Sequence, residues 1–402
     1  MAQTAGFLLC ALICPGGACM EKLTQIRSQL PALSSQVYLN TGTAGPLPEP
    51  VRAAMVESLA AQAAEGRIAT EYYVKLNQLK AQVRAKHAAL LGCEPEEIAL
   101  TQNTTDGMNL VTLGVNWQPG DEAITTNLEH PGALFPLFAA RERYNITIRI
   151  ADVLNRPEEA PAVIERLITP RTKLISLSHV SFITGAVLPI REIAEVAHRH
   201  GVLVLVDGAQ SFGAIPVNVK ELGVDFYAVT GQKWLCGPEG VGALYGSRTA
   251  AAQLRITFAG YGTAQAYDMY AGLLPKGGVQ KLEQGTVQPA NLAGQLAACR
   301  WLTEEVGTDW AYARIRRLAA TARELLARVP GVTVVTPAET AGLVTFQVET
   351  DAERVLKALA QQRIIVRTVP HPRSLRLSAG FYNTEEELEQ LAEALRPLAQ
   401  GG

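Results

Sequence analysis

The apolar run Val-Leu-Val-Leu-Val at residues 202–206 restricts the fold of this chain more than any other feature. A run of this kind without alternation indicates a strand buried on both faces, which is typical of the centre of a parallel sheet. Helical patterns separate this strand from others, which predicts βαβ units and an α/β fold with a mostly parallel sheet. The other strands predicted before it lie at residues 98–101, 121–126, 146–153 and 174–180.

Asp207 follows the apolar run directly, so its carboxylate is expected at the carboxyl edge of the sheet, where ligand sites of α/β proteins collect. A buried carboxylate in that place needs a cationic partner. The amide of Gln210, slightly further along the chain, could donate a hydrogen bond to the same ligand.

A lysine occupies the turn after the next predicted strand. Lys233 follows the strand at residues 225–229 and precedes a hairpin, rich in Gly and Pro, that leads to a strand at 241–245. Thr230 and Gly231 stand before it, and apolar and aromatic residues follow, so we expect a partly desolvated amine. Desolvation lowers the pKa of a lysine, which can then form a Schiff base with an aldehyde such as pyridoxal 5'-phosphate (PLP).

Asp207, Gln210, Thr230 and Lys233 together supply what PLP chemistry requires. A carboxylate keeps the pyridine nitrogen protonated, and a lysine holds the aldehyde. An amide can contact the phenolic oxygen, while hydroxyl and backbone N–H groups bind the phosphate.

Three further loops are ambiguous by themselves. Thr104 and Thr105 open a helix, where unpaired N–H groups could bind a phosphate, but on the residues alone an ordinary N-cap is the favoured explanation. His130 lies just beyond a predicted strand and could contact a ligand or be inert. The loop at residues 40–48, rich in Gly and Pro, is interpreted as a turn rather than as the lip of a substrate site.

With these motifs, the chain from about residue 35 to 400 resembles the class V aminotransferase superfamily of fold-type I PLP enzymes. Its members include cysteine desulfurases, cystine C–S lyases and isopenicillin N epimerase-like proteins. The resemblance implies a large PLP-binding domain at residues 37–290, with a mostly parallel sheet of the seven-stranded type and helices on both faces. It also implies a smaller α+β domain at residues 291–402. Residues 20–36 should form a helical segment that packs with the small domain, and residues 1–19 a disordered extension or a mis-called start.

The resemblance also implies roles for single residues. Lys233 would form the Schiff base and move the Cα proton, Asp207 would pair with the pyridinium nitrogen, and Gln210 would contact the phenolic oxygen. His130 would stack on the cofactor ring. Thr286, in Glu-Gln-Gly-Thr, would reach the phosphate of the partner subunit, which implies a homodimer with shared active sites. The phosphate ligands within one chain would be Thr104, Thr105, Thr230 and Gln232.

The chain departs from the family pattern at two positions. Relatives usually carry histidine directly before the lysine, but Gln232 stands here, so a neutral amide replaces an imidazole donor. Whether this exchange weakens cofactor binding or only replaces one donor by another is open at this point. Desulfurases typically carry asparagine where this chain has Phe182, to which no catalytic role is assigned.

The C-terminal region narrows the choice of activity. A desulfurase needs a nucleophilic cysteine on a mobile loop, whereas residues 367–376 contain none, which disfavours persulfide transfer. Arg367 and Arg376 resemble the carboxylate-binding arginines of cystine C–S lyases, and a guanidinium can hold a carboxylate through two hydrogen bonds. Arg376 is the stronger candidate, because Arg367 could also be a solvated strand residue.

The sequence therefore predicts a PLP-dependent lyase that acts on a small sulfur amino acid, cysteine or cystine, and yields pyruvate, ammonia and a sulfur species. The alternatives are epimerase, desulfurase-like or aminotransferase activity of the same family. A PLP-binding protein without catalysis is the least favoured.

Composition argues against several other classes. The net charge of −2, without a cluster of Lys and Arg, disfavours nucleic-acid and membrane partners. Six irregularly spaced cysteines do not form a disulfide framework, which favours a cytoplasmic protein. The spacing of Cys10, Cys14 and Cys19 matches no metal motif that we recognise, so no metal is predicted. The apolar residues 6–14 are too short to span a bilayer, and a signal peptide is the minority interpretation.

Overall fold

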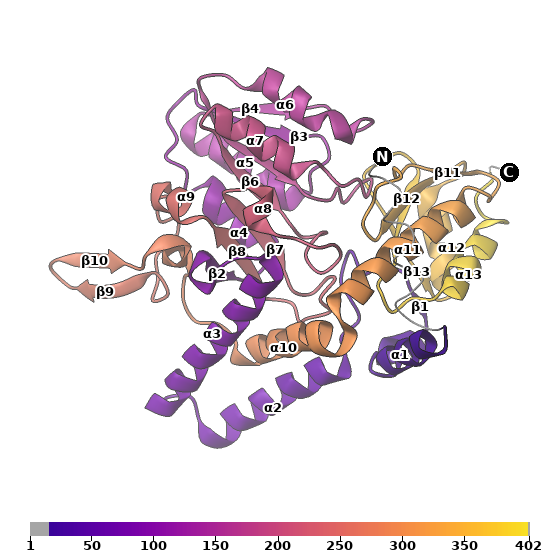
Figure 1. The fold of residues 1–402 in the computed structure, drawn as a ribbon, viewed down its shortest axis with the longest axis horizontal. Helices are drawn as coiled ribbons and strands as arrows, with labels where there is room; N and C mark the ends of the chain where they lie inside the picture. Colours follow the sequence, from indigo (N-terminus) through magenta and orange to yellow (C-terminus); the bar gives the residue numbers. More distant parts are fainter. Residues whose placement is uncertain (1–15, 401–402) are drawn as a thin grey trace, which may run out of the picture.

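A seven-stranded sheet forms the centre of the computed structural model, which describes residues 16–400 (Figure 1). The strand order is β2-β8-β7-β6-β5-β3-β4, and β8 runs in the direction opposite to that of the other strands. The predicted α/β fold with a mostly parallel sheet is confirmed. The strands are β2 (Ile98–Thr101), β3 (Glu122–Thr126), β4 (Thr147–Ala151), β5 (Thr172–Ser178), β6 (Leu203–Asp207), β7 (Phe226–Thr230) and β8 (Gly242–Gly246).

Strand β6 lies in the middle of this sheet, as its apolar run predicts. Val204 and Val206 belong to the core on one face and Leu205 to the core on the other, and all three side chains are fully buried. On the Val204 side the core includes α3 (Thr70–Leu91), α6 (Ala160–Leu167), α7 (Ile190–Arg199) and α8 (Val219–Leu222). On the Leu205 side it includes α4 (Thr104–Thr112), α5 (Pro131–Tyr144) and α9 (Arg248–Gln253).

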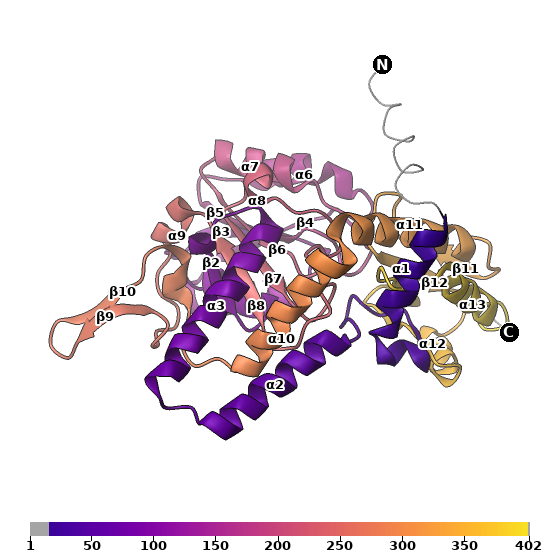
Figure 2. The same ribbon diagram turned by 60° about the horizontal axis from the view of Figure 1, so that its bottom comes forward.

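Helices α2 (Glu49–Glu65) and α10 (Pro289–Arg300) lie side by side along the lower edge of the molecule, next to α3 (Figure 2). The sequence predicts one long helical stretch at residues 292–327. Instead, a π-helical turn (Trp301–Val306) follows α10, and α11 (Thr308–Leu326) begins after Gly307. The interruption has a local cause, because Gly307 has a φ of +79°, which a helix does not allow.

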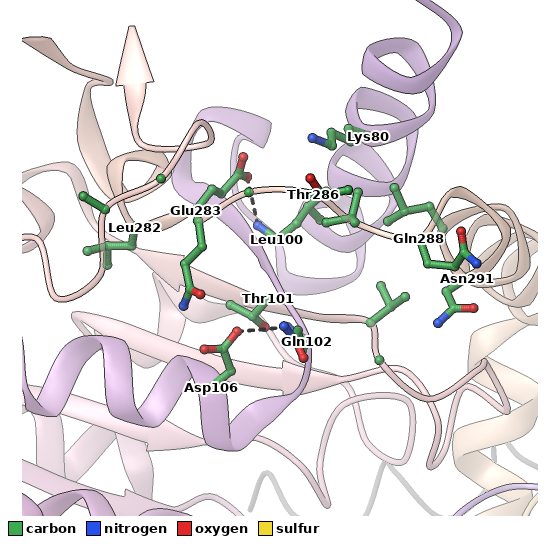
Figure 3. A pocket seen from close by; sticks show the side chains of 18 residues that line it. Lys80, Leu100, Thr101, Gln102, Asp106, Leu282, Glu283, Thr286, Gln288 and Asn291 are labelled. Carbon is green, nitrogen blue, oxygen red and sulfur yellow. Dashed lines mark hydrogen bonds between the residues drawn. The ribbon is translucent and has the colours of Figure 1, made fainter. Parts of the chain in front are cut away.

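The segment after β8 holds a feature that the sequence does not predict. Residues expected to be helical or loop include the antiparallel ribbon of β9 (Ala264–Asp268) and β10 (Gly272–Pro275), which projects from the body (Figure 1). The chain then returns along β2 and borders a pocket of about 530 Å³ (Figure 3).

The C-terminal part is built around a four-stranded antiparallel sheet of order β11-β12-β15-β14. The strand predicted at residues 364–368 is in fact divided, because β13 pairs with β1 (Val37–Tyr38) and only β14 joins this sheet. Helix α11 packs against this sheet together with α12 and α13. The elements are β11 (Val332–Val334), β12 (Leu343–Val348), α12 (Ala352–Gln361), β13 (Ile364–Ile365), β14 (Arg367–Thr368), β15 (Ser374–Ser378) and α13 (Glu385–Leu395).

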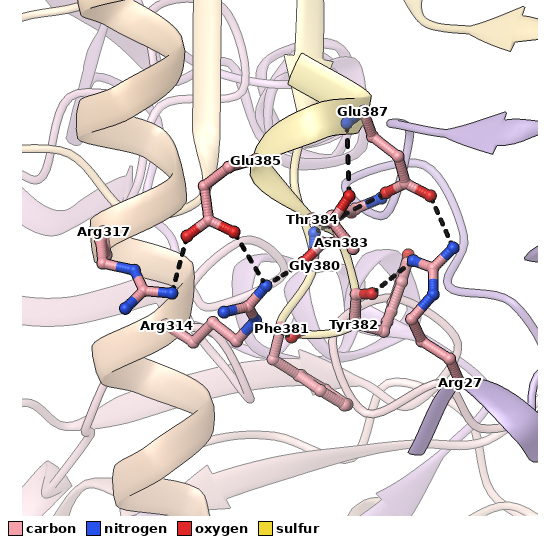
Figure 4. A network of polar contacts seen from close by, with 10 residues as sticks. All are labelled: Arg27, Arg314, Arg317, Gly380, Phe381, Tyr382, Asn383, Thr384, Glu385 and Glu387. Carbon is pink, nitrogen blue, oxygen red and sulfur yellow. Dashed lines mark hydrogen bonds and ion pairs between the residues drawn. The ribbon is translucent and has the colours of Figure 1, made fainter. Parts of the chain in front are cut away.

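Helix α1 (Gly16–Ser28) contacts the C-terminal part through Arg27, which donates to Tyr382 O at 2.8 Å and to Glu387 Oε1 at 2.9 Å (Figure 4). The helix begins before Met20, where the sequence pattern places its start. The predictions of a disordered or wrongly assigned extension and of no metal at Cys10 and Cys14 concern mostly residues 1–15, which lie outside the described residues. The domain boundaries remain a prediction. Among the helices described, none combines the length and the apolar character that a membrane span requires.

Candidate active site

A pocket of about 470 Å³ opens at the carboxyl ends of β6 and β7. It collects every site residue proposed from the sequence except Thr286. These residues are Thr104, Thr105, His130, Asp207, Gln210, Thr230, Gln232, Lys233, Arg367 and Arg376. Five further lining residues were not singled out as site residues from the sequence, namely Gly42, Thr43, Asn103, Phe182 and Ala209.

Asp207 and Lys233 both line this pocket and interact as an ionisable pair. Asp207 ends β6, and its Oδ1 accepts a hydrogen bond of 2.9 Å from the N–H of Ala209. Burial lowers the pKa of Lys233 to about 8, although the charge of Asp207 opposes this shift. Burial likewise raises the pKa of Asp207, against the attraction of Lys233. With a pKa of about 8, roughly one tenth of Lys233 is the neutral, nucleophilic amine at pH 7, far more than for an ordinary lysine.

The loop at residues 40–48, interpreted above as only a turn, forms a wall of this pocket. A Cβ atom on Gly45 would lie 2.3 Å from the carbonyl oxygen of Lys233, so this approach requires glycine. Gln210 donates through Nε2 to Gly42 O at 2.8 Å and accepts at Oε1 from Trp234 Nε1 at 3.0 Å. One amide hydrogen of Gln210 is thus left for a ligand.

His130 is both the N-cap of α5 and a residue of the pocket. Its Nδ1 accepts from the N–H of Gly132 at 3.0 Å, so the proton of the neutral ring resides on Nε2. The ring packs edge-on against Phe182, with 4.8 Å between the centroids. Burial, followed by the charges of Lys233 and the two pocket arginines, lowers the pKa of His130 to about 4. The imidazole is therefore neutral at physiological pH.

The start of α4 offers groups suited to a phosphate. Thr104 Oγ1 is buried and has no hydrogen-bond partner within the described residues, and it lines the pocket beside Thr105. Asn103 caps the helix by accepting from the N–H of Asp106. Thr230 and Gln232 also line the pocket, and the hydroxyl of Thr230 donates to Oε1 of Gln232. An unsatisfied buried hydroxyl at a helix N-terminus fits an anionic group.

Arg376 is fully buried and lines the same pocket. Its Nη1 donates to the carbonyl oxygen of Phe182 at 2.9 Å, whereas Nε and Nη2 have no partner in the described part of the chain. A buried guanidinium with unused N–H groups is costly by itself and would be stabilised by a bound anion. Arg367 is half-buried and uses its N–H groups on Thr368 O and Thr43 Oγ1, at 3.0 and 3.3 Å.

Thr286 lies apart from these residues. It lines the second pocket, together with Lys80, Gln102 and Glu283 (Figure 3). Within one chain, Thr286 is therefore not a member of the Lys233 pocket.

The pocket residues fit PLP. The start of α4 and Thr104 could bind the phosphate. The carboxylate of Asp207 could pair with the pyridine nitrogen, and the amine of Lys233 could react with the aldehyde. The remaining unsatisfied groups, on Arg376, suit a carboxylate of a second molecule.

Comparison with known proteins agrees with a PLP site in this pocket. The family model described as aminotransferase class V matches residues 37–391. An isopenicillin N epimerase of Streptomyces clavuligerus is 32% identical over 390 residues, which cover 90% of this chain and 94% of the relative. A probable cysteine desulfurase of Mycolicibacterium paratuberculosis is 33% identical over 353 residues, or 84% of this chain, but the chain spans only 51% of that relative. The solved complex of the cystine C–S lyase C-DES with its reaction product cysteine persulfide matches with a TM-score of 0.89 at 32% identity, over 92% of this chain and 100% of that chain.

Proposed function

Since this chain belongs to the class V aminotransferase family of PLP-dependent enzymes, we propose that it is a C–S lyase. It would act on cystine or cysteine and release pyruvate, ammonia and a sulfur species. The observation that carries this proposal is a pocket with a carboxylate site at Arg376 and no thiol among its described lining residues.

Bound PLP supplies a protonated ring that withdraws electrons from Cα. The carboxylate of Asp207 would keep the ring nitrogen protonated, and neutral His130 would cover the ring without adding charge. The amine of Lys233 would hold the cofactor and then carry the proton from Cα of the amino acid. Gln210 would donate to the phenolic oxygen. The phosphate would be held by Thr104, Thr105, Thr230 and Gln232.

Arg376 would bind the α-carboxylate of the substrate through Nε and Nη2, the donors for which residues 16–400 provide no partner. Arg367 would add a second, more exposed positive charge at the same end of the pocket. Together these groups would fix the Cα–H bond in relation to Lys233.

The described thiols do not support persulfide transfer. Cys93 is half-buried, Cys236 and Cys299 are buried, and none of the three lines the pocket. Burial raises the pKa of both Cys93 and Cys299 to about 12, so these thiols are protonated and unreactive at physiological pH. A sulfur leaving group would therefore depart to solvent rather than to a described cysteine.

Epimerisation is the second candidate, because the isopenicillin N epimerase relative matches over 94% of its own length. It would use the same removal of the Cα proton, followed by its return on the other face.

We also propose a homodimer. Thr286 lies outside the Lys233 pocket of its own chain, where it could serve the site of a second copy. The ribbon of β9 and β10 exposes Tyr267, Met269 and Tyr270, with 70%, 86% and 100% of each residue accessible. A projecting two-stranded ribbon is marginally stable alone, and such apolar exposure favours contact with another chain. The cytoplasmic location remains a prediction from cysteine content.

The test is a product survey of the holoenzyme incubated with L-cystine and with L-cysteine. Pyruvate and a sulfur species are expected, whereas a D-amino acid would indicate an epimerase and pyridoxamine phosphate an aminotransferase. The Lys233→Ala variant is the control for uncatalysed decay. Absence of pyruvate from both substrates would overturn the lyase proposal.

A further inference from the structure

The loop after β5 is fastened to the C-terminal part through successive backbone carbonyl groups. We call residues 182–185 the strap. Each of its four carbonyl oxygens accepts a hydrogen bond from a side chain of the C-terminal part. The bonds are Arg376 Nη1 to Phe182 O at 2.9 Å, Thr345 Oγ1 to Ile183 O at 2.5 Å, Thr336 Oγ1 to Thr184 O at 2.6 Å and Thr340 Oγ1 to Gly185 O at 2.7 Å.

These hydrogen bonds lie in the interior of the protein rather than on its polar surface. Phe182, Ile183 and Thr184 are all buried, so an unpaired carbonyl in the strap would be costly. Thr345 is itself fully buried in β12, where valine would fill the same space. The hydroxyl therefore serves the strap rather than the packing of the strand.

The strap also joins two parts of the pocket. The ring of Phe182 packs against His130, while its carbonyl oxygen holds the guanidinium of Arg376. A single residue thus links the imidazole proposed to cover the cofactor with the guanidinium proposed to bind the substrate. The strap also approaches β12 closely, because a Cβ atom on Gly185 would lie 2.5 Å from Leu343 O.

We propose that the strap is a positioning element that presets Arg376 relative to His130, so that the carboxylate site exists before an amino acid binds. Phe182 and Thr345 are its positioning residues. The inference rests on the proposed function only in assigning an α-carboxylate to Arg376. Preorganisation of this kind increases affinity, because no ordering of the loop accompanies binding.

The test replaces the strap donors without changing their shape. Thr345→Val removes one hydroxyl, and the double variant Thr340→Val/Thr345→Val removes two. Thr345→Ser keeps a hydroxyl at position 345. Thr333→Val is the control, because it alters an exposed threonine of the same sheet. Binding of glycine, which has no sulfur to lose, is read from the change in cofactor absorbance. Glycine affinity should fall at least fivefold in Thr345→Val and further in the double variant, with Thr345→Ser and Thr333→Val near wild type and PLP loading unchanged.

Arg27→Gln provides a control for general loss of stability, because Arg27 ties α1 to the C-terminal part and does not line the pocket (Figure 4). It should lower the melting temperature and leave glycine affinity within twofold. Glycine affinity within twofold of wild type in the folded double variant would overturn the proposal.

Hydrogen exchange of the wild-type holoenzyme keeps the proposal testable if the valine variants do not fold. The amides of the strap should be protected before glycine is added and unchanged after it. Protection that appears only with glycine would contradict a preset site. Neither readout depends on C–S cleavage, so a failed product survey and a failed strap experiment are distinguishable.

Discussion

The hydroxyl of Thr230 donates a hydrogen bond to the side-chain oxygen of Gln232. This contact leaves the NH₂ group of Gln232 as the donor available to the pocket, at the position where relatives usually carry histidine. An amide remains a neutral donor at every pH, whereas an imidazole gains a charge below its ordinary pKa of about 6.5. The exchange should therefore change how pH affects phosphate binding.

We predict that Gln232→His binds PLP more tightly than wild type at pH 6, and that the difference shrinks towards pH 8 as the imidazole loses its proton. The measurement is the PLP dissociation constant at several pH values. The ratio of the PLP dissociation constants of the two proteins is the informative quantity, because Lys233 and the phosphate titrate in both proteins and their effects cancel. Parallel profiles would show that residue 232 does not contact the phosphate.

Arg376→Lys should raise KM for the amino acid by about 10- to 100-fold and leave PLP affinity unchanged. Lysine cannot form the two-pronged contact, and loss of one hydrogen bond to a charged group is worth about 1.5–3 kcal/mol. Steady-state kinetics and a PLP titration measure the two effects. Arg373→Lys, on the exposed turn before β15, is the matched control. A KM within twofold of wild type would remove Arg376 from the substrate site.

Alkylation of the protein with iodoacetamide should leave pyruvate formation within about twofold of the untreated rate. The described thiols are protonated by burial and lie outside the pocket, so catalysis does not pass through them. Mass spectrometry reports which cysteines react. Complete inactivation with one modified cysteine would instead point to a sulfur-accepting thiol.

Acid should destabilise the protein between about pH 6.5 and pH 4. Burial lowers the pKa of both His87 and His179 to about 4, so in this range the unfolded chain binds protons that the folded chain does not. Stability therefore falls as pH falls, by up to about 3 kcal/mol for each histidine. Urea unfolding at pH 7 and pH 5 should show a smaller loss for His87→Gln than for wild type. The surface variant His198→Gln serves as the control, and equal losses in all three proteins would refute the assignment.

The elements that could be predicted from the sequence are those whose signals are local. Residues 202–206 identify a doubly buried strand without knowledge of its neighbours, and the carboxyl-edge rule then places Asp207. The role of the loop at residues 40–48 has no local signal, because its Gly45 is required by an approach to Lys233, far away in the chain. The same holds for Phe182, since its importance arises from contacts with His130 and Arg376 rather than from its own sequence context.

Long-range pairing also divides the strand predicted at residues 364–368. The run is uniformly favourable for a strand, but Ile364 and Ile365 pair with β1 while Arg367 and Thr368 pair with β15. Pairing partners depend on tertiary structure, which a single run of residues does not encode. The ribbon of β9 and β10 likewise has no clear signal in the sequence, because its exposed apolar residues lack the alternation that a half-buried strand shows.

The most direct test of the proposed activity follows the β-carbon of the substrate. Holoenzyme is incubated with L-cystine labelled with ¹³C at Cβ, and the products are followed by NMR, with Lys233→Ala as the control. For a C–S lyase, we expect the label lost from cystine to appear in the methyl group of pyruvate, at one pyruvate for each bond cleaved. Label in the methyl group of alanine, or retained in D-cystine, would contradict a C–S lyase and identify a desulfurase or an epimerase instead.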